Sequence, residues 1–345
     1  MSDRPAVLLT GATGFIAKHI CLRLLGAGYD VVGTTRDRAR IEEMRAAVTP
    51  ALADPTRADA GLRLIEADLL RDAGWAEAME GVGAVIHCAS PFPMAQPRDP
   101  QAVIAPAVEG TLRVLHAAHA AEVARVVLTS SVAAILYRDK QGERRRDETD
   151  WTDTTHPAAT PYTASKTLAE RAAWDFAEQH PEMKLTAINP GFVAGRPLDG
   201  NYGTSLAVIE RFLSGKDPMV PDFGLPVVEV EDVAAMHLAA LDTDESIGKR
   251  ILAADRFVMM PELATHLAAL HPSRRIATRV APSLLVRAMA LFDRELRSIT
   301  PLLGERLEID NARARRLFGM EFTPALDSVA AAAGFLLERE QAQPA

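Results

Sequence analysis

A glycine-rich turn near the start of the chain joins two segments of different periodicity, in VLLTGATGFIAKHICLRLLGAG. Residues 6–10 have the apolar and β-branched character of a buried strand, and the residues after Gly14 have helical spacing. Gly11 permits a tight turn, Gly14 lets the backbone approach a ligand, and the small Ala17 lets helix and strand pack closely. The segment therefore predicts a strand, a turn and a helix that begin a parallel sheet.

Short apolar runs alternate with segments of helical spacing over the first 190 residues. The runs are AVLLT, DVVGTT, LRLIEA, AVIHCA, RVVLTSS and KLTAINP, at residues 6–10, 30–35, 62–67, 84–89, 125–131 and 184–190. Strands that alternate with helices in this way form parallel sheets covered by helices on both faces. We therefore predict an α/β fold, a doubly wound parallel sheet of the Rossmann type.

This alternation stops after residue 190. Residues 191–227 are rich in Gly and Pro, residues 256–345 have mainly helical patterns, and residues 228–255 resemble a return to the sheet. A chain of 345 residues is long enough to form two cores. We expect a dinucleotide-binding domain over 1–190, completed by 228–255, and a smaller, mostly helical substrate domain over 191–227 and 256–345.

The glycine-rich turn also has the properties of a phosphate-binding site. The N-terminus of the helix that follows it presents free N–H groups, which favour anions. The strand before the turn, the helix after it and its place near the chain start all agree with this interpretation. A bound dinucleotide is therefore expected.

The end of the second predicted strand distinguishes between two dinucleotides. An acidic residue there would hold the ribose hydroxyls of NAD, whereas an arginine favours the 2′-phosphate of NADP. Arg36 stands at this position, and Arg38 and Arg40 add positive charge. The alternative is that Arg36 is a surface residue paired with Asp37. We predict NADP(H) as the cofactor.

The balance of charge argues against nucleic acid and anionic membranes as partners, because both demand a positive surface. The net charge of the chain is −8. Acidic residues directly follow the basic run at 144–146, so we expect a solvated loop there. Two cysteines are too few for a disulfide framework, and the first residues lack a signal-peptide pattern. A cytoplasmic chain is expected.

The segment PYTASKTLAERAAWDFAEQH places Tyr162 and Lys166 on one face of a predicted helix. A phenol has a pKa of about 10, and a nearby cation is needed to favour its ionised form near neutral pH. The strand before this helix ends in TSS at 129–131, at the sheet edge where such folds bind ligands. A hydroxyl, a phenol and an ammonium are therefore expected to meet beside the dinucleotide, as in acid–base catalysis.

With these motifs the chain resembles an extended short-chain dehydrogenase/reductase. TGATGFIA, TSS, YTASK and INPGFVAG occur in the order of that family, and YTASKTLAERAAWDFAE is similar to its branch of dihydroflavonol reductases, cinnamoyl-CoA reductases and microbial carbonyl (aldehyde) reductases. The resemblance implies a reversible, NADPH-dependent reductase of aldehydes or ketones. It implies Tyr162 as general acid, Lys166 as the residue that tunes the phenol and holds the nicotinamide ribose, and Ser131 as hydrogen-bond donor to the carbonyl oxygen.

The expected cofactor-binding residues follow the same motifs. They are Thr10, Gly11, Thr13, Gly14, Phe15, Ile16, Arg36, Asp68, Leu69, Ala89, Ser90, Pro91, Thr129, Tyr162, Lys166, Pro190, Gly191 and Val193. Ala89 and Ser90 match the family segment that runs under the cofactor, and residues 190–193 match the turn beside the nicotinamide. Asp68 either accepts from the adenine amino group or caps the next helix.

Apolar segments surround the expected position of the nicotinamide, at 91–94, 133–137 and 191–193. Pockets of this kind bind by burying hydrophobic surface, so we predict an apolar or aromatic carbonyl substrate. The residues expected to line the pocket are Phe92, Leu136, Tyr137, Phe192 and Tyr202. The alternative is that Arg138 and Arg196 hold a substrate carboxylate.

Two other functions remain open. A nucleotide-sugar epimerase or dehydratase shares the fold and the Tyr/Lys pair, but SSVAA replaces the Thr-Asp-Glu pattern of dehydratases, and Arg36 disfavours NAD. A noncatalytic dinucleotide-sensing module is the other, although such proteins tend to lose the tyrosine or the lysine. Leu136 stands where dihydroflavonol reductases have asparagine, so a plant-type flavonoid substrate is not expected.

No metal site is expected. His116 and His119 have a spacing that suits a metal, but no carboxylate-rich motif accompanies them. The expected partner is a small-molecule carbonyl or alcohol substrate, with the chain acting as a monomer or a homodimer.

Overall fold

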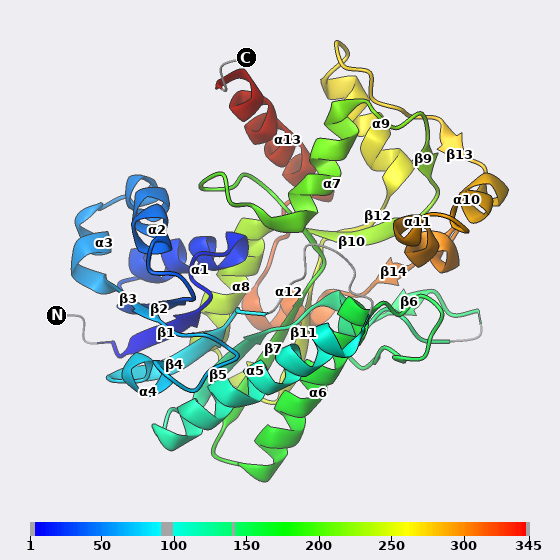
Figure 1. The fold of residues 1–345 in the computed structure, drawn as a ribbon. Helices are drawn as coiled ribbons and strands as arrows, with labels where there is room; N and C mark the ends of the chain where they lie inside the picture. The colour runs from blue at the N-terminus through cyan, green and yellow to red at the C-terminus, as the bar shows by residue number, and fades with distance from the viewer. Residues whose placement is uncertain (1–3, 91–98, 140–141, 343–345) are drawn as a thin grey trace.

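The computed structural model describes residues 4–90, 99–139 and 142–342, and its largest element is a seven-stranded parallel sheet (Figure 1). The strand order is β11-β7-β5-β4-β1-β2-β3. The strands are β1 (Ala6–Thr10), β2 (Val31–Thr35), β3 (Leu62–Glu66), β4 (Val82–His87), β5 (Arg125–Thr129), β7 (Lys184–Pro190) and β11 (Lys249–Ala253). The predicted doubly wound parallel sheet is confirmed.

Helices cover both faces of this sheet. One apolar core lies under α1 (Phe15–Gly26), α2 (Arg40–Val48) and α8 (Val230–Asp242), and the other under α4 (Trp75–Ala78), α5 (Gln101–Ala120) and α6 (Pro161–Gln179). Successive residues of β1 alternate between them, with Val7 and Leu9 in the first core and Leu8 in the second. A strand buried on both faces is typical of a parallel sheet.

A second region begins directly after β7. Its sheet of β8 (Phe192–Ala194), β10 (Gly224–Glu229) and β12 (Arg256–Met259) packs with α7 (Gly203–Ser214), α9 (Met260–Leu270) and α13 (Ala325–Ala342) around a third apolar core. Smaller elements complete the chain: α3 (Thr56–Gly61), β6 (Arg145–Arg146), β9 (Val220–Pro221), β13 (Val280–Ala281), α10 (Ser283–Met289), α11 (Arg294–Ile299), β14 (Glu308–Ile309) and α12 (Ala312–Phe318). Of these, α12 packs against the core of the large sheet through Ala314.

The prediction of a solvated loop at 144–146 is wrong for Arg146, which is 6% exposed. Its guanidinium donates to the backbone carbonyl oxygens of Leu136 (3.0 Å) and Glu143 (2.9 Å). With Arg145 it forms β6, which pairs with β14. Five N–H donors let one buried guanidinium satisfy the carbonyls of an irregular segment, and no repeating sequence pattern reveals such acceptors.

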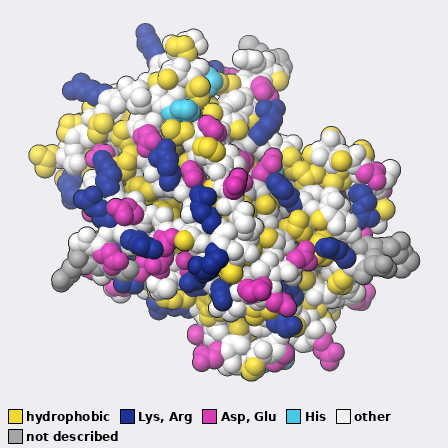
Figure 2. All heavy atoms as spheres, turned by 180° about the vertical axis from the view of Figure 1, so that it is seen from behind, with side chains coloured by type: hydrophobic (Ala, Val, Ile, Leu, Met, Phe, Trp, Pro, Cys, Tyr) yellow, Lys and Arg dark blue, Asp and Glu magenta, His cyan; other side chains and the backbone are white. Residues whose placement is uncertain are grey.

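The surface carries charges of both signs. Figure 2 shows Lys and Arg side chains interspersed with Asp and Glu over the face seen from behind. Exposed pairs include Arg256 with Glu262 (2.7 Å) and Arg306 with Asp222 (2.9 Å). A surface of mixed sign gives little net attraction for a polyanion. None of the helices within the described ranges is long and apolar enough to cross a membrane.

Two buried histidines fix the ends of central strands. The ring of His87 pairs through Nδ1 with the Thr10 hydroxyl at 2.8 Å, and His237 on α8 pairs through Nε2 with the Thr129 hydroxyl at 2.7 Å. The Nδ1 atom of His237 donates to the carbonyl oxygen of Val233. Burial lowers the pKa of His87 to about 3, an effect that the Lys166 charge increases, and burial lowers the pKa of His237 to about 4. Both rings are therefore neutral in the folded chain at neutral pH.

We predict that mild acid destabilises the fold through these rings. Each histidine of the unfolded chain takes up a proton below about pH 6.5, whereas the folded chain does so only near its own lower pKa. The contribution of each ring to the free energy of unfolding should be constant well above pH 6.5 and fall as the pH decreases from 6.5 towards 4, by up to about 1.4 kcal/mol per pH unit. His237→Gln should lower this slope, measured by urea unfolding between pH 7 and pH 5. An unchanged slope in the variant would show that His237 does not cause it.

Candidate active site

A cleft of about 850 Å³ lies along the carboxyl edge of the large sheet. The ends of β1, β2, β4, β5 and β7 and the first turns of α1, α6 and α7 line it. Open parallel sheets bind ligands at this edge, and the volume is in the usual range for a small-molecule site. A second hollow of about 650 Å³, between α4 and α5, contains none of the residues expected to bind cofactor or substrate.

The glycine-rich turn forms one end of the cleft. Gly11 has a φ of +65°, and a Cβ atom there would lie 3.0 Å from the Cα of Ala89. Its N–H donates to the Thr34 hydroxyl (3.1 Å), and the N–H of Gly14 donates to the Gly11 carbonyl (2.9 Å). Gly14 is the N-cap of α1 and offers no side chain to its first N–H groups. The turn is therefore tight, and the N-terminus of α1 is open to an anion.

The buried residue Thr10 stabilises the glycine-rich turn. It is fully buried, and its hydroxyl accepts the N–H of Ala89 (2.9 Å) besides pairing with His87. These contacts tie the end of β1 to the end of β4. Thr10 therefore shapes the cleft without lining it.

Arginines mark the end of β2. Arg36 is exposed, lines the cleft and forms no ion pair with any residue in the described parts of the chain. Arg38 turns away from the cleft to the Glu66 carboxylate (2.8 Å), and Arg40 pairs with Glu43 while donating to the Thr13 carbonyl (3.2 Å). The geometry leaves Arg36 as the cation available to a phosphate, with Arg40 beside the turn.

Most residues expected to bind the cofactor line this cleft. These are Gly11, Thr13, Gly14, Phe15, Ile16, Arg36, Asp68, Leu69, Ala89, Ser90, Thr129, Tyr162, Lys166, Pro190, Gly191 and Val193. Pro91 lies outside the described residues. One carboxylate oxygen of Asp68 accepts the N–H of Leu70 (3.0 Å), so the side chain also stabilises its own turn.

Several residues of the lining are not expected from the sequence. Trp75, Gly203, Thr204 and Ser205 belong to this group. Trp75 donates its indole N–H to the Asp68 carbonyl (3.1 Å), and the other three begin α7 in the second region. Their segments carry no recurring motif, so only the fold brings them to the cleft.

The start of α6 positions two of the expected catalytic residues. Thr160 is the N-cap, its hydroxyl accepts the N–H of Thr163 (3.2 Å), and Pro161 occupies the first helical position. A capping threonine followed by proline fixes where a helix begins. Tyr162 therefore stands in the first turn and Lys166 one turn later, both partly buried and both lining the cleft.

The two serines after β5 have different hydrogen bonds. Ser130 donates its hydroxyl proton to the Glu170 carboxylate (2.5 Å). The Ser131 hydroxyl accepts the N–H of Ala133 (3.1 Å), and within the described residues its own proton has no acceptor, so it can be donated into the cleft that Ser131 lines. This difference favours Ser131, as the sequence analysis expects, for binding a carbonyl oxygen.

The residues expected to contact the substrate do not all line the cleft. Tyr202 lines the cleft and stacks edge-on against Phe335 (ring centroids 6.2 Å apart). Leu136 is buried in a small core with Val132 and Leu252 and does not line the cleft, because the segment after β5 turns inward. The positions of the remaining three are as follows: Tyr137 borders the same small core, Phe192 packs against the core of the second region, and Phe92 lies outside the described residues.

Tyr137 nevertheless lies close to Tyr162. Burial, reinforced by the neighbouring Tyr162, raises the pKa of Tyr137 to about 12. The ring of Tyr137 stacks on His156 with centroids 6.3 Å apart. Tyr137 is therefore a neutral phenol beside the expected catalytic one.

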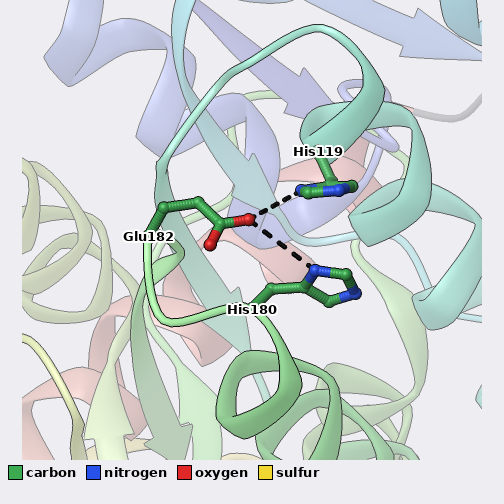
Figure 3. Close-up of side chains that lie close together, drawn as sticks. All are labelled: His119, His180 and Glu182. Carbon is green, nitrogen blue, oxygen red and sulfur yellow. Dashed lines mark ion pairs between the residues drawn. The ribbon is translucent and has the colours of Figure 1, made fainter.

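One histidine cluster lies away from the cleft. His119 at the end of α5 approaches Glu182 (Nδ1 to Oε1, 2.9 Å), and His180 approaches the same oxygen (3.6 Å), as Figure 3 shows. Their ligand atoms lie within 4.8 Å of one another, close enough to hold a metal. His116 instead packs edge-on against Phe176. The cluster is at the opposite end of α6 from Tyr162 and contributes nothing to the cleft.

The chain belongs to the NAD dependent epimerase/dehydratase family, whose model matches residues 7–254. It is 35% identical to cinnamoyl-CoA reductase CAD2 of Medicago truncatula over 281 residues, covering 80% of this chain and 83% of the relative. It is 32% identical to ketoreductase azaE of Aspergillus niger over 355 residues, covering 96% and 98%. Its fold matches yeast methylglyoxal/isovaleraldehyde reductase Gre2 complexed with NADPH with a TM-score of 0.80, at 26% identity and over 97% and 99% of the two chains. The resemblance to extended short-chain reductases is confirmed.

Proposed function

We propose that this chain reduces apolar or aromatic aldehydes and ketones to alcohols with NADPH, and that Tyr162 supplies the proton. The chain is an NADP-dependent oxidoreductase that acts on carbonyl or alcohol groups, as its reductase relatives indicate. One observation carries the finer proposal: a single cleft contains the glycine-rich turn, Arg36 and the trio of Ser131, Tyr162 and Lys166.

The cleft has the features that NADPH requires. Gly11 lets the turn pack directly against Ala89, where a Cβ atom would be too close, and α1 begins without a side-chain cap. Arg36 offers a guanidinium for the 2′-phosphate, and Pro190, Gly191 and Val193 border the far end. These residues would hold the two ends of an extended dinucleotide along the sheet edge.

When bound, NADPH supplies a hydride to the carbonyl carbon. The carbonyl oxygen then carries negative charge and needs a proton, which the Tyr162 hydroxyl donates. Ser131 donates a hydrogen bond to the same oxygen and orients it. The Lys166 ammonium stabilises the phenolate left on Tyr162, because an opposite charge nearby favours the ionised form. In the direction of alcohol oxidation Tyr162 acts as the base.

The arginines that could hold a charged substrate already have partners. Arg138 pairs with Asp150 (2.6 Å), and Arg196 pairs with both oxygens of Glu338 (3.0 and 2.5 Å). Each guanidinium would have to give up its carboxylate partner to bind a substrate carboxylate, and neither Arg138 nor Arg196 lines the cleft. The aromatic ring of Tyr202 lines the cleft from the second region. These features support a neutral, apolar substrate.

The residues of the cleft also help to distinguish a reductase from the two alternative functions, an epimerase or dehydratase and a noncatalytic dinucleotide sensor. The family description covers epimerases and dehydratases, but relatives with 35% and 32% identity are reductases. Arg36 stands where an acidic residue would favour NAD. The presence of Tyr162 and Lys166 in the cleft supports an enzyme rather than a noncatalytic dinucleotide sensor.

The substrate class is tested with two aldehydes of the same ring, benzaldehyde and 4-carboxybenzaldehyde. We expect kcat/KM for NADPH oxidation to be at least about tenfold higher for the neutral compound, because burying an unpaired carboxylate is costly. Arg196→Gln should leave this ratio unchanged. Turnover of sugar nucleotides together with none of any apolar carbonyl compound would overturn the proposal.

Cofactor preference is tested with Arg36→Asp. A hydrogen bond to a charged group contributes about 1.5–3 kcal/mol, so kcat/KM should favour NADPH over NADH by roughly ten- to a hundredfold, and the variant should reverse or abolish this preference. Arg38→Asp makes the same change in net charge outside the cleft and should keep the preference. Equal values for the two cofactors in the unmodified chain would rule out the role given to Arg36.

Proton donation is tested with Tyr162→Phe. General acid catalysis contributes about 10²–10⁴-fold, so kcat should fall by about that factor while the Kd for NADPH, measured by nucleotide fluorescence, stays within threefold. Tyr137→Phe removes the same atom from the neighbouring ring and should cost less than about tenfold, because that phenol transfers no proton. Near-normal turnover by Tyr162→Phe would contradict the mechanism.

A further inference from the structure

Glu170 is a buried carboxylate that no step of the proposed reaction uses. It lies on α6 one turn beyond Lys166, so Tyr162, Lys166 and Glu170 follow one another along the same face of the helix. Glu170 is 1% exposed and is not part of the cleft lining. A carboxylate in such a place requires donors for both oxygens.

The two oxygens have separate sets of donors. Oε2 accepts from the Ser130 hydroxyl (2.5 Å), from Nδ2 of Asn189 (2.7 Å) and from Nη2 of Arg250 (3.3 Å). Oε1 accepts from Nε of Arg250 (2.6 Å) and from the indole N–H of Trp174 (3.2 Å). Ser130, Asn189 and Arg250 belong to the ends of β5 and β7 and to β11. One side chain therefore connects the helix that carries Tyr162 to three neighbouring strands.

Arg250 is itself fully engaged. Its guanidinium donates to the carbonyl oxygens of Glu148 (3.1 Å) and Ala134 (3.2 Å) and lies 3.7 Å from the ring centre of Trp151. Because these contacts satisfy the cation, the buried ion pair with Glu170 leaves neither partner without hydrogen bonds. The pair also fixes the segment that follows Ser131.

We propose that Glu170 is a positioning residue, which holds the Tyr162 hydroxyl at the distance from Ser131 that proton transfer needs. Two of its donors are directly linked to Ser131: Ser130 precedes it in the chain, and Nδ2 of Asn189 also donates to the Ser131 carbonyl (3.2 Å). The carboxylate thus fixes Ser131 from two sides relative to α6. This inference rests on the proposed function, in which both hydroxyls act on one carbonyl oxygen.

The position requires a carboxylate rather than an amide. Every neighbour of Oε1 and Oε2 is a donor. In Glu170→Gln the amide NH₂ would face one of these donors, so one link must break. Because proton transfer depends on hydrogen-bond distances, a displacement of about 1 Å between the reacting groups can cost about 10²-fold in rate.

A purely structural role for Glu170 predicts a different result. A variant that is only less stable contains less active enzyme, and its KM and its pH profile stay the same. A variant that displaces Tyr162 and Lys166, which both lie on α6, from Ser131 lowers kcat of the folded enzyme and changes the pH profile of kcat, because proton donation and the hydrogen bond from Ser131 no longer act together on one oxygen.

The test compares Glu170→Gln and the milder Ser130→Ala with Trp174→Phe in the full chain. Trp174→Phe removes one hydrogen bond from the same carboxylate, but its donor lies on α6 itself and not on a strand end. For each variant, the melting temperature, the Kd for NADPH, kcat, KM and the pH profile of kcat are measured with benzaldehyde. We expect Glu170→Gln and Ser130→Ala to lower kcat by about 10–100-fold with shifted pH profiles, a Kd within threefold, and Trp174→Phe to keep kcat within twofold.

The outcomes separate this inference from the proposed function. If Tyr162→Phe keeps its turnover, the proposed function fails whatever Glu170 does. If Tyr162→Phe loses turnover while Ser130→Ala matches Trp174→Phe in kcat and pH profile, the positioning role fails. Should Glu170→Gln not fold, Ser130→Ala alone decides. Ser130→Cys, which keeps the volume and a weaker donor, should then fall between Ser130→Ala and the unmodified chain.

Discussion

Parallel pairing in the middle of the large sheet is the constraint on which the site depends. Thr10 is the register partner of His87, His87 of Leu128, and Thr129 of Ile188. Where neighbouring parallel strands end at the same level, the residues that follow them lie together at the carboxyl edge of the sheet. The glycine-rich turn and the two serines meet there because of this register. A slip of one residue would take Thr10 out of register with His87 and turn the alternating side chains of the strand to the opposite face of the sheet.

The sequence predicts well those features that depend on local pattern. The strand expected at residues 6–10 is β1 as the structure has it, and the helix expected to carry Tyr162 and Lys166 is α6. Contacts between segments far apart in the chain leave no such pattern. Glu182 contacts His119 only because α5 and α6 pack side by side. Leu136 is buried because the chain turns inward after β5, and an apolar segment alone does not show whether its residues are buried in a core or line a pocket.

Buried guanidinium groups order the irregular segment between β5 and α6. Arg146 and Arg250 each donate to several backbone carbonyl oxygens of this segment. Thr152 adds a hydrogen bond from its hydroxyl to the Ala133 carbonyl (2.7 Å). These contacts satisfy backbone acceptors that would be costly to bury alone. The described parts of this segment, which begins at Ser130, are therefore held in place although they contain little regular structure.

Two of the crossings between the two regions lie next to one another. Gly191 is the only residue between β7 and β8, β10 passes into α8 at Glu229 without a loop, and β8 and β10 pair with each other, Val193 against Val228. Short adjacent connections of this kind permit bending about one line and resist sliding or twisting. A relative movement of the two regions about these two connections would be mainly a bend, which changes the width of the cleft between the sheet edge and α7.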